Sequence, residues 1–236
     1  DHADDLGADM MATGHYVRKG EKDGLFQLLK GVDQNKDQSY FLYAINQYQL
    51  SRSLFPVGEI EKPEVRAIAE SLGLDVYNKK DSTGICFIGE KRFQTFLSTY
   101  LKPNPGDIVT PTGQIVGEHN GLMYYTIGQR QGLGIGGVKD SLPEPWFVIA
   151  KQHRDNQLVV AQSDHQELML GQQLTAKQVN WIAGHSPSFP LSCRAKIRYR
   201  QADQDCVVTL AENDTLHVTF DDPQKALTPG QSVVFY

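Results

Sequence analysis

The chain has 236 residues, of which 40% are hydrophobic and 22% are charged, which is the balance of an ordinary globular protein with one large or two to three small domains. Its formal net charge of -5 excludes a nucleic-acid partner held by the field of the whole molecule, so such a partner would need a local basic face. No apolar run approaches the ~20 residues that span a bilayer, and three cysteines without close spacing argue against a secreted disulfide scaffold, so we expect a cytoplasmic protein with no membrane partner.

The opening of the chain has the pattern of a helix end. Residues 1–9 begin without Met, and Gly7 is a residue type that commonly ends a helix. We therefore expect the chain to be the C-terminal part of a longer protein.

The first ninety or so residues then alternate strands and helices. Apolar runs predict a short buried strand over 10–13 and another strand over 26–29. Helical patterns follow over 37–49 and over 63–72, the second with a proline in its first turn, one apolar face and a glycine directly after it. This alternation is typical of an α/β domain.

The rest of the chain is predicted to be mostly β. An amphipathic helix with an apolar stripe over 93–101 ends at a Pro- and Gly-rich segment, and we place a domain boundary near its start. Short strands over 107–109 and 114–116 flank a turn. From residue 156 onward, strands recur at intervals of roughly ten residues, which is the rhythm of a small sandwich or barrel. Within it, Leu216, Val218 and Phe220 alternate with polar residues and predict one dry face.

Two patterns suggest cofactor sites that we do not expect. The glycine-dense run 128–137 contains a formal dinucleotide-binding fingerprint, but the prolines at 143 and 145 interrupt any helix after it, so we interpret the run as a flexible loop. No histidine lies three to five residues from another and no Cys-x-x-Cys occurs, so no zinc site is expected. His15 follows Gly14 at the end of a predicted strand, where α/β sheets bind ligands; the alternative is an incidental loop histidine.

Residues 193–200 carry the strongest electrostatic signal. In a strand, four cations would share one face: Arg194, Lys196, Arg198 and Arg200. Like charges about 7 Å apart repel unless an anion lies across them, and a phosphate backbone is the natural candidate. The alternative is a solvated strand paired with the acidic residues nearby in sequence, which are Asp203, Asp205, Glu212 and Asp214. The same alternation directs Cys193 toward the core.

Cys86 lies between Gly84 and Gly89, with two lysines upstream and a Lys-Arg pair downstream. Nearby cations and oriented backbone amides lower the pKa of a thiol, so the segment has the features of a reactive thiolate. The alternative is a small buried apolar residue, because Phe87 and Ile88 follow directly.

Five segments, taken in order, resemble the bacterial tRNA-specific 2-thiouridylases. They are Ala12–Tyr16, Lys36–Leu42, Asp81–Gly89, Tyr125–Arg130 and Pro229–Tyr236. The resemblance covers essentially the whole chain. It implies a partial adenine-nucleotide alpha-hydrolase-like (Rossmann-like) α/β domain over 1–94, a small, mostly β, tRNA-binding central domain over 95–155 and a C-terminal antiparallel β-barrel over 156–236.

The family resemblance also implies a reaction. The enzyme would replace the oxygen at the 2-position of the wobble uridine of tRNA with sulfur, using ATP to activate the carbonyl oxygen and a cysteine persulfide as sulfur source. Cys86 matches the persulfide cysteine, and Gly14 matches a nucleotide-contacting residue. The residues that match tRNA contacts are His15, Lys36, Asp37, Gln38, Arg198, Tyr199 and Gln231. The implied partners are the anticodon arm of tRNA and a persulfide-donating sulfur-relay protein; Mg²⁺ is implied for the full-length enzyme, with no metal in this chain.

One departure from the family pattern is large. The glycine- and serine-rich ATP-pyrophosphatase loop is not in this chain, and the second family cysteine, which resolves the persulfide by forming a disulfide, would lie upstream of it. We therefore expect the chain alone to be inactive in thiolation. Two alternatives stay open, namely a non-catalytic tRNA-binding fragment and an ATP-pyrophosphatase relative acting on a small molecule.

Overall fold

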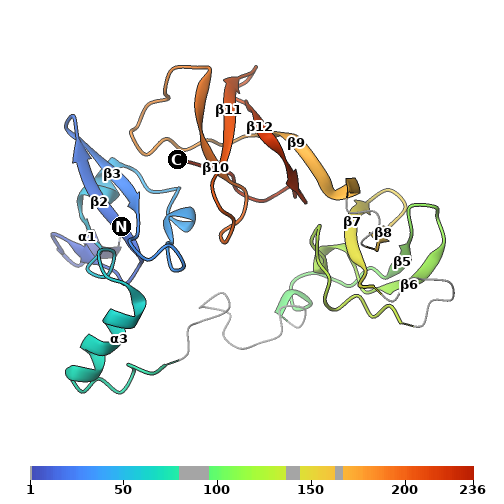
Figure 1. The fold of residues 1–236 in the computed structure, drawn as a ribbon, viewed down its shortest axis with the longest axis horizontal. Coiled ribbons are helices and arrows are strands. Elements are labelled where there is room, and N and C mark those ends of the chain that lie inside the picture. The colour runs from blue at the N-terminus through green and yellow to red at the C-terminus, as the bar shows by residue number, and fades with distance from the viewer. Residues whose placement is uncertain (1, 80–95, 137–143, 163–166) are drawn as a thin grey trace. The chain divides into compact units, whose positions relative to one another are not determined.

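Figure 1 shows a computed structural model of the chain, which describes residues 2–79, 96–136, 144–162 and 167–236. The chain divides into two compact units. The first comprises Asp1–Lys80, Gln173–Asp221 and Gln231–Tyr236, and the second comprises Asp81–Gln172 and Asp222–Gly230. Among the described residues, no helix combines the length and the apolar composition needed to cross a membrane.

Short elements make up the N-terminal part of the first unit. They are α1 (His2–Asp5), β1 (Met11–Ala12), β2 (Val17–Lys22), β3 (Leu25–Lys30), the 3-10 helix η1 (Ser39–Phe41), α2 (Gln47–Ser51), β4 (Ser53–Leu54) and α3 (Lys62–Ser71). β2 and β3 form an antiparallel hairpin, which confirms the strand predicted over 26–29. Its turn residues Asp23 and Gly24 have φ values of 53° and 76°, the left-handed pair that a tight two-residue hairpin turn requires.

The first predicted strand forms, but its predicted burial is wrong. β1 pairs in parallel with β4, and each strand has two residues, so little sheet covers the side chains. Met10 is 44% exposed and Met11 is 52% exposed.

The helix predicted over 37–49 is also wrong. The structure has η1 and the separate helix α2 there, because the two ends of the segment are fixed by other contacts. Asn46 takes an extended conformation and caps α2 through a reciprocal pair of hydrogen bonds with Gln49, so the helix begins at Gln47.

The helix predicted over 63–72 is confirmed as α3, with a proline in its first turn. Gly73 has φ +65° and donates its N–H to Glu70, as expected for a helix end. Gly7 ends α1 in the same way, with φ +68° and a hydrogen bond to Asp4. The apolar face of α3 is only partly covered, because Val65 and Ala69 are half-buried while Ile68 is exposed.

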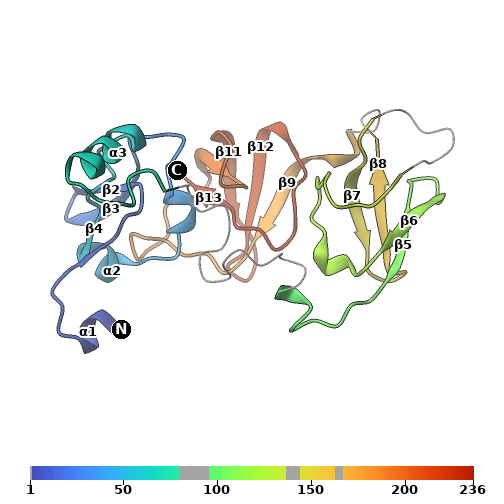
Figure 2. The ribbon, with the colours of Figure 1, turned by 90° about the horizontal axis from the view of Figure 1, so that it is seen from below.

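A five-stranded sheet has the order β13-β10-β11-β12-β9. Its strands are β9 (Leu170–Ala176), β10 (Leu191–Lys196), β11 (Gln204–Leu210), β12 (Leu216–Lys225) and β13 (Val234–Phe235), several of which are labelled in Figures 1 and 2. The dry face predicted for β12 is confirmed, since Leu216, Val218 and Phe220 are buried. The recurring strands predicted from residue 156 onward are confirmed too. The predicted barrel is not seen, because none of the sheets in the described ranges closes into one.

The second unit contains a four-stranded sheet of order β6-β5-β8-β7. Its elements are β5 (Gly106–Val109), β6 (Ile115–His119), the 3-10 helix η2 (Leu122–Tyr124), β7 (Phe147–Gln152) and β8 (Gln157–Ala161). β5 and β6 confirm the two strands predicted around the turn at Gly113, whose φ is +85°. Residues 128–136 contain neither helix nor strand, as the interpretation as a loop predicts. Of the helix predicted over 93–101, residues 93–95 lie outside the described residues and residues 96–97 are helical.

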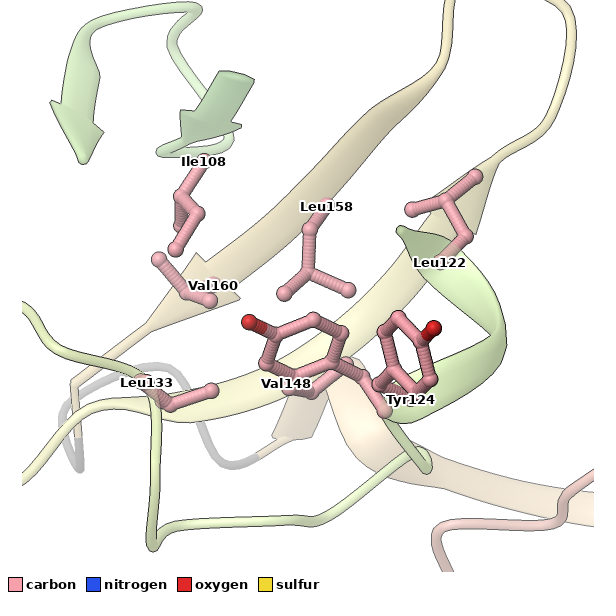
Figure 3. Packing of buried hydrophobic residues seen from close by; sticks show 8 residues of the cluster. Ile108, Leu122, Tyr124, Leu133, Val148, Leu158 and Val160 are labelled. Carbon is pink, nitrogen blue, oxygen red and sulfur yellow. The ribbon is translucent and has the colours of Figure 1, made fainter. Parts of the chain in front are cut away.

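Apolar side chains from the strands and from η2 form the core of the second unit. Figure 3 shows Ile108, Val148, Leu158 and Val160 converging on the same interior as Tyr124. Leu158 is fully buried, and Trp146 packs against the cluster from its edge.

A group of buried and half-buried polar side chains joins the loop before η1 to the five-stranded sheet within the first unit. We call it the Asp37 cluster; its members are Lys30, Asp37, Lys196, Asp203 and Tyr236. The Asp37 carboxylate accepts hydrogen bonds from the backbone N–H groups of Gly31 and Ser39 and from the Ser39 hydroxyl. Lys196 Nζ lies 3.7 Å from oxygens of both Asp37 and Asp203.

Two lysines balance the two carboxylates of this cluster. Lys30 donates to Asp203 and lies 4.1 Å from the centre of the Tyr236 ring. The Ser39 hydroxyl is 3.0 Å from the Tyr236 hydroxyl, and burial raises the pKa of Tyr236 to about 12. The cluster is therefore neutral overall and satisfied by internal partners, which is the condition under which charges tolerate burial.

Replacing Leu158 with Ala should lower the free energy of unfolding of the second unit by about 2–5 kcal/mol, because a fully buried side chain leaves a cavity. The measurement is urea denaturation followed by Trp146 fluorescence in a Trp181→Phe background, since the chain has 2 tryptophans. Ile115→Ala is the control: Ile115 is 62% exposed, and the change should stay near ~0.5 kcal/mol. Equal losses in both variants would contradict the assignment of the core.

Replacing Asp37 with Asn should lower the free energy of unfolding of the first unit by about 3 kcal/mol, because it leaves the Lys196 charge buried with one carboxylate fewer. Trp181 fluorescence in a Trp146→Phe background reports this unit. Asp205→Asn removes an exposed ion pair with Arg194 and should cost less than ~1 kcal/mol. A loss for Asp37→Asn no larger than for this control would show that the cluster does not hold the unit together.

Candidate nucleic-acid interface

Three segments that are distant in sequence are tied together at Tyr40 in η1. The buried Tyr40 hydroxyl lies 2.9 Å from the carbonyl oxygen of Ser232 and 3.3 Å from that of Ile197, to both of which it can donate. Burial raises the pKa of Tyr40, so the hydroxyl stays protonated as a donor. Arg198 and Tyr199 follow Ile197 directly, and Gln231 precedes Ser232, so these predicted tRNA contacts are brought next to η1.

The run Lys36–Gln38 is attached to the segment that carries His15. The side-chain oxygen of Gln38 accepts the Tyr16 N–H at 2.9 Å, and the Gln38 N–H donates to the Tyr16 carbonyl at 3.1 Å. Gly31 also lies against the Tyr16 carbonyl, where a Cβ would be only 2.6 Å from the oxygen, so a larger residue would force the two backbones apart. The predicted contact residues of both segments therefore belong to one local structure.

His15 and Gly14 have different surroundings. The Nδ1 atom of His15 lies 2.7 Å from the Thr13 hydroxyl, a contact that orients the half-buried ring. Gly14 is exposed, and no atom lies within 4 Å of the position that a Cβ would take. The backbone at Gly14 is thus open to a ligand, which fits the predicted nucleotide contact.

Asp37 differs from its two neighbours in the predicted run. It is 4% exposed, and its carboxylate is occupied by the internal partners of the Asp37 cluster, whereas Lys36 and Gln38 are half-buried. The geometry makes Asp37 a residue that positions the run. Its predicted contact with tRNA stays a prediction.

An aromatic pair, with one exposed and one half-buried ring, lies beside these polar residues. Phe41 is 52% exposed, and its ring centroid is 4.4 Å from that of Tyr199, at an interplanar angle of 38°. Burial, followed by Asp37, raises the pKa of Tyr199, while the nearby cations Arg200 and Lys36 lower it. Lys36 therefore lies close enough to influence Tyr199.

We call the resulting region the aromatic-basic surface; its members are Lys36, Phe41, Arg198, Tyr199 and Gln231. Sequence reasoning missed Phe41, although it lies in one of the segments that carry the family resemblance. Its neighbour Tyr40 is buried and Phe41 is exposed, and this difference depends on partners more than 150 residues away.

The predicted row of four cations on a strand is wrong. β10 ends at Lys196, and residues 197–200 form a turn in which the Gln201 side chain accepts the Ile197 N–H. Lys196 is buried in the Asp37 cluster, and Arg194 lies 3.6 Å from Asp205. The alternative of pairing with nearby acidic residues therefore holds for these two cations.

The alternation predicted that Cys193 faces the core. The structure places Cys193 on the inner face of β10, where it opposes the buried Cys206, but leaves it half-buried. Cys86 lies outside the described residues, so its reactivity stays a prediction. Within the described part of the chain, no three His, Cys, Asp or Glu residues are grouped so that they could hold a metal ion.

Comparison with known proteins places three family models along the chain in succession. They are described as a tRNA methyl transferase HUP domain over residues 1–90, a tRNA methyl transferase PRC-barrel domain over 94–162 and an aminomethyltransferase beta-barrel domain over 171–236.

Curated relatives match the chain over almost its full length. A protein of Psychromonas ingrahamii is 57% identical over 99% of this chain and 64% of its own length, and one of Nitrosococcus oceani is 56% identical over 100% of this chain and 64% of its own. A Pseudomonas aeruginosa protein is 56% identical over 100% of this chain and 63% of its own length. All three are named tRNA-specific 2-thiouridylase MnmA, and the chain spans a little less than two thirds of their length. The chain belongs to the tRNA-specific 2-thiouridylase family and corresponds to part of such a protein.

Proposed function

We propose that the chain holds the anticodon arm of a tRNA on the aromatic-basic surface and contributes Cys86 as the persulfide cysteine of a tRNA 2-thiouridine synthase. The whole protein would use ATP to activate the 2-position oxygen of the wobble uridine and would receive sulfur from a persulfide-donating partner in the cytoplasm. The observation that carries the proposal is the contact between the exposed Phe41 ring and the half-buried Tyr199 ring, with Lys36 near Tyr199 and Arg198 directly before it in the sequence.

This surface has the chemistry that unpaired RNA nucleotides require. Proteins bind single-stranded loops by stacking bases on aromatic rings and by placing cations along the phosphates. Phe41 offers an exposed ring face, and Arg198 follows the backbone that Tyr40 fixes. Because the chain is acidic overall, with a formal net charge of -5, this local arrangement has to supply the attraction.

The sulfur-transfer step needs an anionic sulfur nucleophile near the base. A cysteine persulfide forms when the thiolate of Cys86 takes a sulfur atom from a donor, and nearby cations favour that thiolate. ATP, when bound, would turn the uridine oxygen into a leaving group, and Gly14 is the residue of this chain that we assign to nucleotide contact. The pyrophosphatase loop of the family would belong to the remainder of the whole protein.

Thiolation is favoured over the methyl transfer that two of the family-model descriptions mention. The relatives at 56–57% identity are named 2-thiouridylases. Cys86 sits in a segment that matches the persulfide motif of that family, and it gives sulfur transfer a residue that the reaction requires.

Incubating the chain with a persulfide donor should add one sulfur atom at Cys86, because a thiolate with lysines near it in the sequence is a good sulfur acceptor. Mass spectrometry of the peptide that contains Cys86 measures the addition, and Cys86→Ser should show none. An inert Cys86 in a chain that still binds tRNA would favour the alternative of a non-catalytic tRNA-binding fragment.

Replacing Phe41 with Ala should weaken binding of an anticodon-arm RNA by roughly 5- to 150-fold, the loss of one base stack worth about 1–3 kcal/mol. Fluorescence anisotropy with labelled RNA measures the dissociation constant, and Trp181 fluorescence checks that the unit stays folded. Tyr48→Ala is the matched control, since Tyr48 is a 57% exposed aromatic residue whose hydroxyl bonds Asp4 instead. Equal effects of the two changes would remove Phe41 from the interface.

Arg198→Ala should weaken binding of the anticodon-arm RNA to a similar extent whatever the RNA sequence. It should also reduce the slope of log affinity against log salt concentration by about 1, as expected for one phosphate contact. Arg194→Ala serves as its control, because Arg194 lies on β10 and is not a member of the aromatic-basic surface. An unchanged slope in Arg198→Ala would contradict the phosphate contact.

A further inference from the structure

Two cysteines face each other across β10 and β11. Cys193 and Cys206 are directly opposite in the antiparallel register, and their sulfur atoms are 3.8 Å apart as free thiols. The proposed reaction at Cys86 uses neither of them.

Backbone geometry places this pair within reach of a disulfide bond. Opposed residues of antiparallel strands have Cα atoms about 4.5–5.5 Å apart. Disulfides join residues whose Cα atoms are about 4.4–6.8 Å apart, so bond formation requires rotation of the side chains and no movement of the strands.

The two thiols differ in access to solvent. Cys193 is half-buried, whereas Cys206 is 3% exposed. A cavity of about 430 Å³ is lined by both residues, with Arg194 and Tyr236 also on its wall. An attacking reagent therefore reaches Cys193 first, and Cys206 is placed to act second.

The contact between the sulfur atoms also separates their acidities. A hydrogen bond from the Cys206 thiol lowers the pKa of Cys193. The same hydrogen bond, together with burial, raises the pKa of Cys206. The more accessible sulfur is thus the better nucleophile at neutral pH.

We propose that Cys193 and Cys206 form a redox-active dithiol that small disulfides of the glutathione class convert into a cross-strand disulfide. The Cys193 thiolate attacks one sulfur of the reagent, the reagent's S–S bond breaks, and one thiolate leaves. The Cys206 thiol then gives its proton to solvent and attacks the Cys193 sulfur, and the second reagent thiolate leaves. The two cysteines lose two electrons in total, and the reagent gains them as two thiols.

The disulfide bond would cross-link two neighbouring strands of the sheet close to the Asp37 cluster. Arg194 follows Cys193 and exchanges two backbone hydrogen bonds with Tyr236, a member of that cluster. The bond would thus fix β10 to β11 next to the strand pairing that holds Tyr236, so the first unit of the oxidised chain should melt at a higher temperature than that of the reduced chain.

The test is treatment of the native 236-residue chain with oxidised glutathione, followed by alkylation of the remaining thiols and tryptic digestion. We expect peptides 178–194 and 201–225 to be recovered joined to each other, with neither carrying glutathione. In Cys206→Ser the reaction should stop with glutathione retained on Cys193. In Cys193→Ser, Cys206 should react at least ~10-fold more slowly than Cys193 does in Cys206→Ser.

Three outcomes would overturn the proposal. They are glutathione retained on Cys193 in the native chain, no reaction at either residue, and a predominant link from either residue to Cys86. The native-chain result needs no variant, so it stands even if a substitution disturbs folding. It is also independent of tRNA binding and of sulfur loading at Cys86.

Discussion

The carboxylate of Asp37 is the interaction on which the rest of the first unit depends. It accepts hydrogen bonds from two backbone N–H groups and a hydroxyl of its own segment, and it lies beside Lys196 of the five-stranded sheet. A buried charge is costly unless it is paired and hydrogen-bonded, so the segment and the strand have to meet in one arrangement. The same requirement fixes Lys36 and Gln38 on either side, and through them the aromatic-basic surface.

Tertiary contacts of this kind explain where sequence reasoning succeeded and where it failed. Leu216, Val218 and Phe220 could be assigned to a buried face, because alternation along one strand is a local signal. The burial of Lys196, which takes it out of the predicted row of exposed cations, could not be foreseen, because its partner Asp37 lies about 160 residues earlier. The exposed Phe41 and the buried Tyr40 could not be told apart for the same reason.

One failure was avoidable from the sequence. The predicted helix over 37–49 ignored Asn46 with Gln49 three residues later, which is the signature of a capped helix start. The interpretation of Cys86 has a different basis, because it rests on the sequence motif around the residue and not on structural contacts. The family assignment and the proposed chemistry there rest on sequence, whereas the proposed tRNA-binding surface also draws on the contacts of Tyr40 and Phe41.

The Tyr40 hydroxyl has a consequence for the order in which the molecule is made. It joins a residue near the start of the chain to the carbonyl oxygen of Ser232, 192 residues later. A ribosome releases the two partners in that order, so the Tyr40 hydroxyl cannot gain this acceptor until Ser232 has been synthesised. The aromatic-basic surface, which includes Gln231, can therefore assemble only after segments nearly 200 residues apart have both been made.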